Sequence, residues 1–362
     1  MTHVAILSPF MIDGDAVSND VIGMYQALIR AGYEVQVFAA EWRISNPKIE
    51  DVNQIHLFIG SSDDILIYHY SLKWDVGLKL LQELQCIKII KYHDITPPEF
   101  YEGINDDYFR VCTDGREQLQ SIVDARCRLY LADSDYNQQE LYSKGVEQNH
   151  CLVLTPFHQI ARLQDEEVDL NVMDKYQDGK TNILMVGRLA PNKGYVALID
   201  AFKIYYNNYN RESRLLIVGK EDERLIKYTT LLYEQVKSLG LEDAVVFTGG
   251  VSEQALKAYY LVSHVFMITS EHEGFCVPLV ESMAMKLPIV AYGSSAIPYT
   301  VGKTGLVWEQ PDPYLLAGSV DNIARNEFIS ANLGDMAWRR YKETFANEQI
   351  EARFMAAIKS LL

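Results

Sequence analysis

Two glutamates eight residues apart, Glu273 and Glu281, bracket a predicted turn from a strand into a helix. The apolar run 265–268 predicts a buried strand, Gly274 breaks it, and Pro278 suits the first turn of the helix that follows. Free backbone N–H groups at a helix N-terminus attract anions, phosphate above all. Carboxylates accept hydrogen bonds from hydroxyl groups. The segment therefore indicates a site for a nucleotide sugar, although two solvated glutamates remain the plain alternative.

Two cations follow another buried strand. Arg188 and Lys193 lie in the loop "GRLAPNKG", directly after the apolar run 183–186. Ligands of open α/β sheets bind beyond the carboxyl ends of the strands, which is where this loop lies. A guanidinium and an ammonium there can neutralise a diphosphate. Two ordinary surface bases are the alternative, and the helix that begins near Pro278 favours the diphosphate site.

The elements that position these residues alternate between strand and helix. Such alternation predicts α/β domains whose parallel sheets are covered on both faces. Ten strands are expected, at 4–7, 34–38, 65–68, 87–90, 129–131, 183–186, 215–218, 245–247, 265–268 and 288–290. The acidic segment 156–181 interrupts this alternation of strand and helix. We therefore predict an N-terminal domain over 1–160, a linker over 161–181, a C-terminal domain over 182–346 and a last helix over 347–362 that could join either domain.

The composition of the chain limits the kinds of partner and the compartment that we expect for it. The chain has 362 residues, which is enough for two domains, and a formal net charge of −16, which disfavours a nucleic-acid partner. Five scattered cysteines without a C-x-x-C pattern suggest free thiols in a reducing compartment. No apolar stretch approaches the length of a membrane span, and the first residues lack the basic start of a signal peptide. We expect a cytoplasmic protein, and peripheral contact with the inner membrane face stays open.

Several segments together resemble a known family. "GRLAPNKG" and "EHEGFCVPLVES", at this separation, resemble the donor domain of retaining family 4 glycosyltransferases (glycosyl transferases group 1). "LLIVGKE", "VVFTGGVS" and "KTGLVWE" fit the same family, as do "KYHDITPPEF" and "LADSDYNQQEL" in the N-terminal half. The resemblance spans nearly the whole chain. It implies the GT-B fold, with two facing Rossmann-like doubly wound domains, an interdomain cleft, and the acceptor and donor sites in the N- and C-terminal domains.

The resemblance also implies roles for single residues. Arg188 and Lys193 would hold the donor diphosphate, Glu281 the ribose hydroxyls and Glu273 the hydroxyls of the transferred sugar. His93 would lie near the anomeric centre, although a histidine at a strand end is commonly structural. The remaining binding positions are backbone contacts to sugar, phosphate or base: Gly14, Asp15, Gly250, Val251, Gly274, Phe275, Cys276, Val277, Pro278 and Leu279.

Three positions depart from the family pattern. Gly14 stands alone where the family commonly has two adjacent glycines, which weakens the assignment of Gly14 and Asp15. Cys276 stands where a small residue, often glycine, is usual, and we assign no thiol chemistry to it. Tyr299 stands where the family often has glutamate, which leaves the role of that loop open.

The implied activity is the transfer of a sugar from a nucleotide diphosphate sugar, with UDP as the family expectation, to a hydroxyl of a saccharide or lipid-linked glycan. The family further implies retention of configuration, no metal and no cofactor, in polysaccharide or glycoconjugate biosynthesis. A nucleotide-sugar epimerase or phosphorylase and a non-catalytic nucleotide-sugar-binding protein stay as alternatives. The pair Asp133 and Asp135 could hold a metal ion, but Asp133 or Ser134 more simply caps the following helix.

Overall fold

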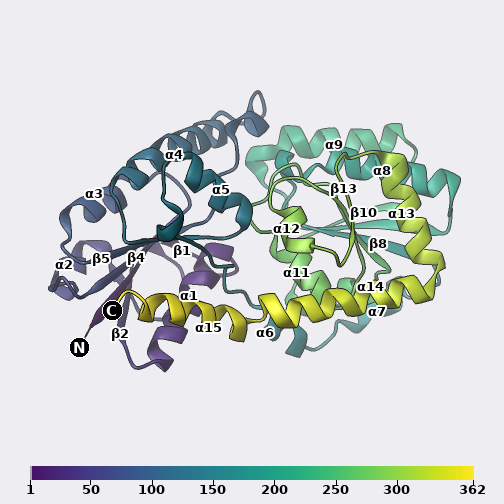
Figure 1. Ribbon diagram of the computed structural model, residues 1–362. Helices are drawn as coiled ribbons and strands as arrows, with labels where there is room; N and C mark the ends of the chain where they lie inside the picture. The colour runs from purple at the N-terminus through teal and green to yellow at the C-terminus, as the bar shows by residue number, and fades with distance from the viewer. Residues whose placement is uncertain (1) are drawn as a thin grey trace. The chain divides into compact units, whose positions relative to one another are not determined.

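The computed structural model describes residues 2–362 and divides into two compact units. Unit 1 comprises 1–98, 107–158 and 344–362, and unit 2 comprises 99–106 and 159–343. Each unit contains one parallel sheet with helices on both of its faces (Figure 1). The expectation of α/β domains with Rossmann-like sheets is confirmed.

Unit 1 contains a sheet of seven strands in the order β3-β2-β1-β4-β5-β6-β7. The strands are β1 (His3–Met11), β2 (Glu34–Trp42), β3 (Ile49–Asp51), β4 (Ile65–Tyr70), β5 (Ile87–Tyr92), β6 (Leu129–Ala132) and β7 (Cys151–Val153). The helices are α1 (Ala16–Arg30), α2 (Ile55–Phe58), α3 (Asp75–Glu83), α4 (Asp106–Asp124), α5 (Asp135–Ser143) and α15 (Asn347–Lys359), with 3₁₀ turns at Val52–Gln54 and Gln148–His150. A further 3₁₀ turn, Pro98–Tyr101, lies mostly in the segment 99–106, which belongs to unit 2.

Unit 2 contains a sheet of six strands in the order β10-β9-β8-β11-β12-β13. The strands are β8 (Thr181–Val186), β9 (Ser213–Val218), β10 (Val245–Gly249), β11 (Val265–Ile268), β12 (Ile289–Tyr292) and β13 (Leu306–Trp308). The helices are α6 (Ile160–Asp165), α7 (Leu170–Tyr176), α8 (Tyr195–Asn208), α9 (Ile226–Ser238), α10 (Glu253–Val262), α11 (Val277–Ala284), α12 (Ile297–Val301), α13 (Pro313–Arg325) and α14 (Glu327–Arg340), with 3₁₀ turns at Pro191–Lys193 and Glu223–Leu225 and a π-helical turn at Tyr341–Phe345.

Burial explains why the central strands were recognisable from the sequence. Every residue of β4, β9 and β11 is buried, as parallel strands covered on both faces must be. All ten predicted strands are present. The three strands that the sequence did not indicate, β3, β7 and β13, have three residues each and lie at sheet edges.

The segment 161–181, which we predicted as a linker, instead forms α6 and α7 and belongs to unit 2. Lys257 on α10 donates from its Nζ to the backbone carbonyls of Gln164 and Glu166, at 2.5 and 2.6 Å. Gln164 in turn donates to the carbonyl of Ala284 at the end of α11, at 3.0 Å. These bonds attach the segment to the two helices that carry the candidate site.

The last helix, α15, belongs to unit 1 although it follows the whole of unit 2 in sequence. Figure 1 shows it beside α1, at the other end of the colour scale. Arg30 on α1 and Glu351 on α15 form an ion pair at 2.5 Å, and the rings of Phe157 and Phe354 meet edge to face at 6.2 Å. Helix α15 therefore completes the core of unit 1.

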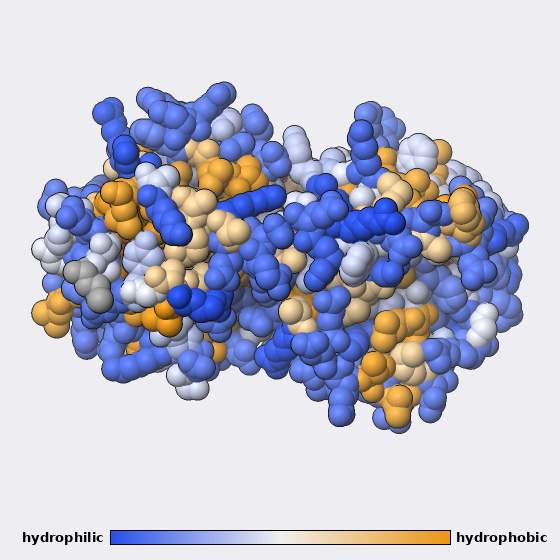
Figure 2. Space-filling view, turned by 60° about the horizontal axis from the view of Figure 1, so that its bottom comes forward, coloured by the Kyte–Doolittle hydropathy of each residue, from blue (hydrophilic) through white to orange (hydrophobic). Residues whose placement is uncertain are grey.

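One face of the molecule is mostly hydrophilic (Figure 2). Figure 2 shows hydrophilic residues over most of one face, with hydrophobic residues gathered in separate patches. Among residues 2–362, no helix combines the length and the hydropathy that a membrane crossing requires.

Gly194 ends the loop after β8 and is required there by its surroundings. Its φ is +63°, and a Cβ at this position would lie 2.0 Å from the carbonyl oxygen of Thr269. Replacing Gly194 with Ala should lower the free energy of unfolding by about 3 kcal/mol or more, from left-handed strain plus overpacking.

Gly240 is a matched control, because its φ is +64° but a Cβ there would meet nothing within 4 Å. Gly240→Ala should cost only about 1–2 kcal/mol, the strain alone. Urea unfolding of both variants measures the difference. Equal losses in the two variants would show that the contact with Thr269 does not constrain this loop.

Candidate active site

The two motifs of the predicted donor site meet in unit 2. β8 and β11 are adjacent parallel strands, so the loops that follow them lie at the same edge of the sheet. The chain order reverses here, since β9 and β10 lie on one side of β8 while β12 and β13 lie beyond β11. This is the position at which doubly wound sheets bind their ligands. Arg188 and Lys193 follow β8, and Glu273 follows β11.

An ion pair joins the two loops. The ammonium of Lys193 lies 2.8 Å from each carboxylate oxygen of Glu273. The Lys193 side chain is 18% exposed and that of Glu273 is 7% exposed, so the pair is largely shielded from water. The carboxylate thus faces the cation that we predicted to bind the diphosphate. Arg188 is exposed, and among residues 2–362 its side chain has no ion-pair partner.

Neutral hydrogen bonds hold the same two loops together. The side chain of Asn192 donates to the carbonyl of His272 at 3.0 Å, and the carbonyl of Asn192 accepts from the N–H of Glu271 at 2.8 Å. The N–H of Glu273 also donates to the Ser295 hydroxyl at 2.7 Å, which joins the second loop to the loop after β12. We did not identify Asn192 and Ser295 from the sequence. The position of Asn192 inside the "APNKG" loop was the one available signal.

Helix α11 starts within the second motif. Its N-cap, Cys276, adopts the left-handed region with φ 73°, and Pro278 lies in the first turn as predicted. Burial raises the pKa of the Cys276 thiol well above its usual value, and the nearby Glu273 carboxylate adds to the shift. The thiol is therefore protonated at neutral pH, which agrees with our assigning no thiol chemistry to it.

Glu281 lies one turn further along α11 and is half-buried. Its carboxylate accepts a hydrogen bond of 2.6 Å from the hydroxyl of Tyr260 on α10. Burial raises the pKa of Glu281, and the Tyr260 hydrogen bond opposes that shift. Sequence reasoning missed Tyr260, because nothing in a helical tyrosine marks it as the partner of a distant glutamate.

The other predicted backbone positions of unit 2 follow from these elements. Gly250 and Val251 come directly after β10, and a Cβ on Gly250 would lie 2.6 Å from the Lys220 side chain. Gly274 and Phe275 link Glu273 to α11, and the Phe275 carbonyl accepts from Thr300 at 2.9 Å. Val277 and Leu279 lie in the first turn of α11. Tyr299 is 47% exposed on α12.

Gly14 and Asp15 lie in unit 1, at the start of α1. Gly14 has φ +74° and forms an exposed turn. Asp15 is the N-cap of α1, and its carboxylate accepts from the backbone N–H of Ser18 at 3.0 Å and from the Ser18 hydroxyl at 3.1 Å. The side chain of Asp15 is thus used for capping, which restricts its direct contact with a ligand.

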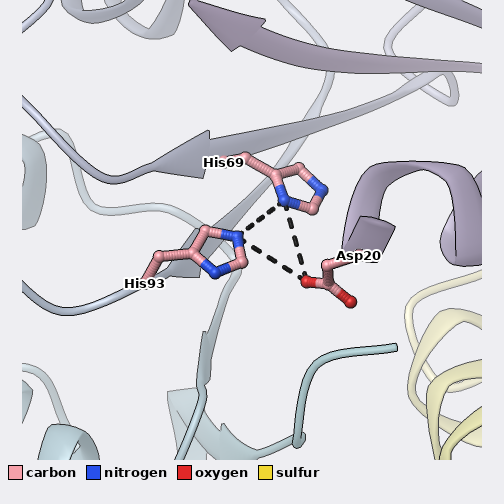
Figure 3. A group of neighbouring side chains, drawn as sticks. All are labelled: Asp20, His69 and His93. Atoms are coloured by element: carbon pink, nitrogen blue, oxygen red, sulfur yellow. Dashed lines mark hydrogen bonds and ion pairs between the residues drawn. The ribbon is translucent and has the colours of Figure 1, made fainter. Parts of the chain in front are cut away.

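His93 belongs to a buried cluster of five ionisable side chains in unit 1. The cluster lies at the carboxyl ends of β4, β5 and β6 and against α1, and consists of Asp20, His69, Lys91, His93 and Asp133. Figure 3 shows Asp20, His69 and His93 pointing toward one another from three different elements. Of the five, the sequence indicated only His93 as a site residue, with Asp133 as a cap or metal ligand.

Both ring nitrogens of His93 have partners. Nδ1 lies 3.1 Å from a carboxylate oxygen of Asp133, and Nε2 lies 2.8 Å from Nδ1 of His69. Because a carboxylate only accepts, Nδ1 of His93 carries the hydrogen of the contact with Asp133, and one of the two facing nitrogens, Nε2 of His93 or Nδ1 of His69, carries the hydrogen of the other bond. The His93 side chain is 5% exposed. Direct contact between this imidazole and a substrate therefore requires one of these bonds to be exchanged.

Of the two residues that we predicted as the cap of the helix after β6, Ser134 is the cap. Ser134 caps α5, since its hydroxyl accepts from the N–H of Asn137 at 3.3 Å, whereas Asp133 pairs with Lys91 and His93. Burial opposes the ionisation of Asp133, but Lys91 and His93 outweigh it and lower the pKa of this carboxyl. Asp135 is the first residue of α5. The pair Asp133 and Asp135 is thus not built as a metal site.

Asp20, His69 and His93 could hold a metal ion, since one ligand atom from each lies within 4.8 Å of the others. Two observations disfavour a metal ion there. The facing nitrogens of His69 and His93 share one hydrogen at 2.8 Å, so they do not both offer a lone pair, and the Lys91 ammonium already lies 3.9 Å from Asp20 Oδ2. Burial raises the pKa of Asp20 to about 6, with Lys91 and His93 opposing the shift and Asp133 adding to it.

The comparisons with known proteins agree with this fold. Sucrose-phosphate synthase of Thermosynechococcus elongatus superposes with a TM-score of 0.78 at 17% identity, covering 100% of this chain and 99% of that one. HepE of Anabaena in complex with UDP superposes with a TM-score of 0.76 at 16% identity, covering 99% and 100%. The predicted GT-B fold is confirmed.

The fold is the GT-B fold of glycosyltransferases, and the family comparison points to the same class of protein. Residues 173–340 match the family described as Glycosyl transferases group 1. Mannosylfructose-phosphate synthase of Agrobacterium fabrum is 27% identical over 312 residues, 80% of this chain and 67% of the relative. An uncharacterized glycosyltransferase of Methanocaldococcus jannaschii is 23% identical over 372 residues, 92% and 88% of the two chains. The match to the family of Glycosyl transferases group 1 thus lies in unit 2 and covers a little under half of this chain.

The raised pKa of Asp20 makes stability depend on pH. The folded protein holds this proton up to about pH 6, whereas the ordinary pKa is 3.8. The stabilisation is therefore complete below pH 3.8 and is lost as the pH rises through about 6. The loss amounts to roughly 3 kcal/mol. Asp20→Asn, which carries no titrating proton, should remove this pH dependence.

Urea unfolding between pH 4 and 7 tests this expectation against Asp63→Asn, a variant of an exposed carboxylate in the same unit. The wild type and Asp63→Asn should share one pH profile, while the stability of the wild type relative to Asp20→Asn should fall as the pH rises through about 6. The comparison is made as a difference because the buried His158, whose pKa is lowered to about 4, acts in the opposite sense in all three proteins. Parallel profiles for all three proteins would show that Asp20 does not hold the proton of the cluster.

Proposed function

We propose that this protein transfers a sugar from a nucleotide diphosphate sugar to a hydroxyl of a saccharide or lipid-linked glycan, with retention of the anomeric configuration. The observation that carries the proposal is the ion pair of Lys193 and Glu273, which brings the phosphate-binding and sugar-binding motifs together at one edge of the unit 2 sheet. The family of residues 173–340 supports the reaction class.

The donor would bind along the carboxyl edge of that sheet. Arg188 is exposed and without an ion-pair partner in the described part of the chain, so it is available to the diphosphate. Lys193 has three donors, and Glu273 leaves one free for a phosphate oxygen. The N–H groups at the start of α11 would add to this field. Glu273 would then bind the transferred sugar, and Glu281 the ribose.

UDP is the nucleotide that we propose. The structures of HepE of Anabaena include complexes with UDP and with UDP-glucose, and they share the fold of this chain. The backbone of Gly250 and Val251, after β10, would contact the base. Unit 1 would bind the acceptor, with the cluster around His93 at the carboxyl edge of its sheet.

The proposed chemistry uses charge stabilisation of the leaving group. Arg188, Lys193 and the start of α11 would stabilise the departing diphosphate, which is where negative charge develops. The leaving phosphate would take the proton of the acceptor hydroxyl, so we assign no general base. These groups supply the positive field that a metal ion supplies elsewhere, and we propose transfer without a metal.

The double variant Arg188→Ala/Lys193→Ala should lose transfer by about 10³-fold or more, because both charges on the leaving group are removed. Lys303→Ala/Arg339→Ala removes the same charge from exposed positions of unit 2 and should retain activity. Product formation is measured with a UDP-sugar and a saccharide acceptor. Near-wild-type turnover in the first variant would refute the diphosphate assignment, and loss of activity in EDTA would refute metal independence.

A thermal-shift screen with UDP-, GDP- and ADP-sugars should give the largest stabilisation with a UDP-sugar. Glu281→Gln should weaken that binding about tenfold, because the amide lacks the charge that strengthens hydrogen bonds from ribose hydroxyls. Tyr260→Phe removes the partner of Glu281 but keeps its carboxylate, and should weaken binding less. A screen with no shift for any nucleotide sugar would exclude this ligand class, and donor turnover without acceptor would indicate an epimerase.

A further inference from the structure

The amino-terminal edge of the unit 1 sheet, at the other ends of the strands from His93, carries a group of cations. Lys88 is the second residue of β5, Arg126 and Arg128 lie between α4 and β6, and His150 precedes β7. These four residues line one cavity of ≈ 480 Å³. No aspartate or glutamate lines this cavity. Its volume is in the range of small-molecule sites.

Two of the cations are direct neighbours across the sheet. Ile90 on β5 pairs with Tyr130 on β6, and the N–H of Arg128 donates to the carbonyl of Lys88 at 2.9 Å. Side chains alternate between the faces of a sheet, so Lys88 and Arg128, each two residues earlier, project from the same face. Like charges on adjacent strands destabilise a sheet unless something balances them.

The acidic residues of the adjoining segments do not provide that balance. Glu83 pairs with Lys79 at 3.7 Å, and Asp124 accepts from Gln120 at 3.0 Å. Asp64 accepts from the backbone N–H groups of Gly60 and Ser61, at 2.9 and 2.8 Å, and from that of His3. Among residues 2–362, none of the three permanent cations of the cavity has an ion-pair partner. Three cations thus lie together without a carboxylate at ion-pair distance, in a chain of net charge −16.

The backbone at Arg126 adds a second observation. Its φ of 51° lies in the left-handed region, which residues other than glycine adopt at a cost in free energy. The turn is closed by the N–H of Arg126, which donates to the carbonyl of Val123 at 3.0 Å. Glycine would satisfy this turn without strain. We explain the arginine at this strained position by the positive charge that its side chain brings to the cavity.

We propose that this cavity binds a phosphate-bearing anion between Lys88, Arg126 and Arg128. Guanidinium groups bind phosphate oxygens with two parallel hydrogen bonds, and an ammonium adds a third charge-assisted contact. The phosphate supplies the negative charge that the cross-strand pair lacks. The cavity exceeds one phosphate in size, so the ligand is a phosphorylated small molecule or a lipid headgroup ending in a phosphate monoester. This site is separate from the proposed donor site in unit 2 and does not depend on it.

Calorimetric titration of the full chain with pyrophosphate at low ionic strength tests the site. We expect two binding events in the wild type, one in each unit. Arg126→Gln/Arg128→Gln should weaken one event about tenfold or more. The control Arg43→Gln/Arg353→Gln changes the net charge equally at exposed positions of unit 1 and should keep both events. Pyrophosphate binding that is equal in the two double variants would overturn the proposal.

A further variant separates this proposal from the proposed function. Arg188→Ala/Lys193→Ala should lose the other event and keep the one that depends on Arg126 and Arg128. If the proposed donor site in unit 2 does not bind pyrophosphate, the binding event that depends on Arg126 and Arg128 should still be observed. Citrate that binds the Arg126 and Arg128 site as tightly as pyrophosphate would overturn the assignment to phosphate.

Two ligand sources are then distinguished. Flotation with vesicles of phosphatidylcholine containing phosphatidic acid, lost in Arg126→Gln/Arg128→Gln and kept in the control variant, would identify a lipid phosphate. Binding of glucose 6-phosphate with the same dependence, without flotation, would identify a soluble phosphate ester. Both results support the site. Circular dichroism of each variant confirms that the exposed substitutions leave the fold intact.

Discussion

The ion pair between Lys193 and Glu273 is the interaction on which the candidate site of unit 2 depends. It joins the loop after β8 to the loop after β11, at the point where the chain order of the sheet reverses. Alone, a shielded ion pair is weak evidence of stability, since burying two charges costs desolvation free energy. Here two hydrogen bonds of Asn192, one from its side chain and one to its carbonyl, join the same loops. The positions of Lys193 and Glu273 are therefore fixed by these bonds as well as by the ion pair.

This arrangement changes how the two glutamates are understood. Their spacing could suggest a general acid and a general base. In the structure, Glu273 is matched with a cation and Glu281 with a tyrosine hydroxyl, and neither carboxylate faces the other as a partner. Groups held in this way accept hydrogen bonds from a ligand and are poorly suited to proton transfer. The geometry favours carboxylates that position a donor, with the reaction driven by charge stabilisation on the leaving group.

That the two motifs of the proposed donor site lie together could be predicted, because each is short and its strand, loop and helix are visible in sequence. The cluster around His93 could not. His69 and Asp133 lie 24 and 40 residues away along the chain, and Asp20 is a buried acid within a helix. Only the parallel pairing of β4, β5 and β6 brings these groups together. The sequence did not predict α6 and α7 for another reason. Helices of six and seven residues are too short to show a helical period.

Net charge and local charge act differently in this chain. A formal charge of −16 disfavours the approach of any anion at long range. At physiological ionic strength, however, charges separated by more than about 8 Å are largely screened, so the nearest groups decide binding. In unit 2 the charge of Lys193 is balanced by Glu273, which leaves Arg188 and the start of α11 as the uncompensated positive field. At the amino edge of unit 1, Lys88, Arg126 and Arg128 are uncompensated as well. Anion binding by this acidic protein therefore depends on where carboxylates are absent, and the overall composition does not reveal those places.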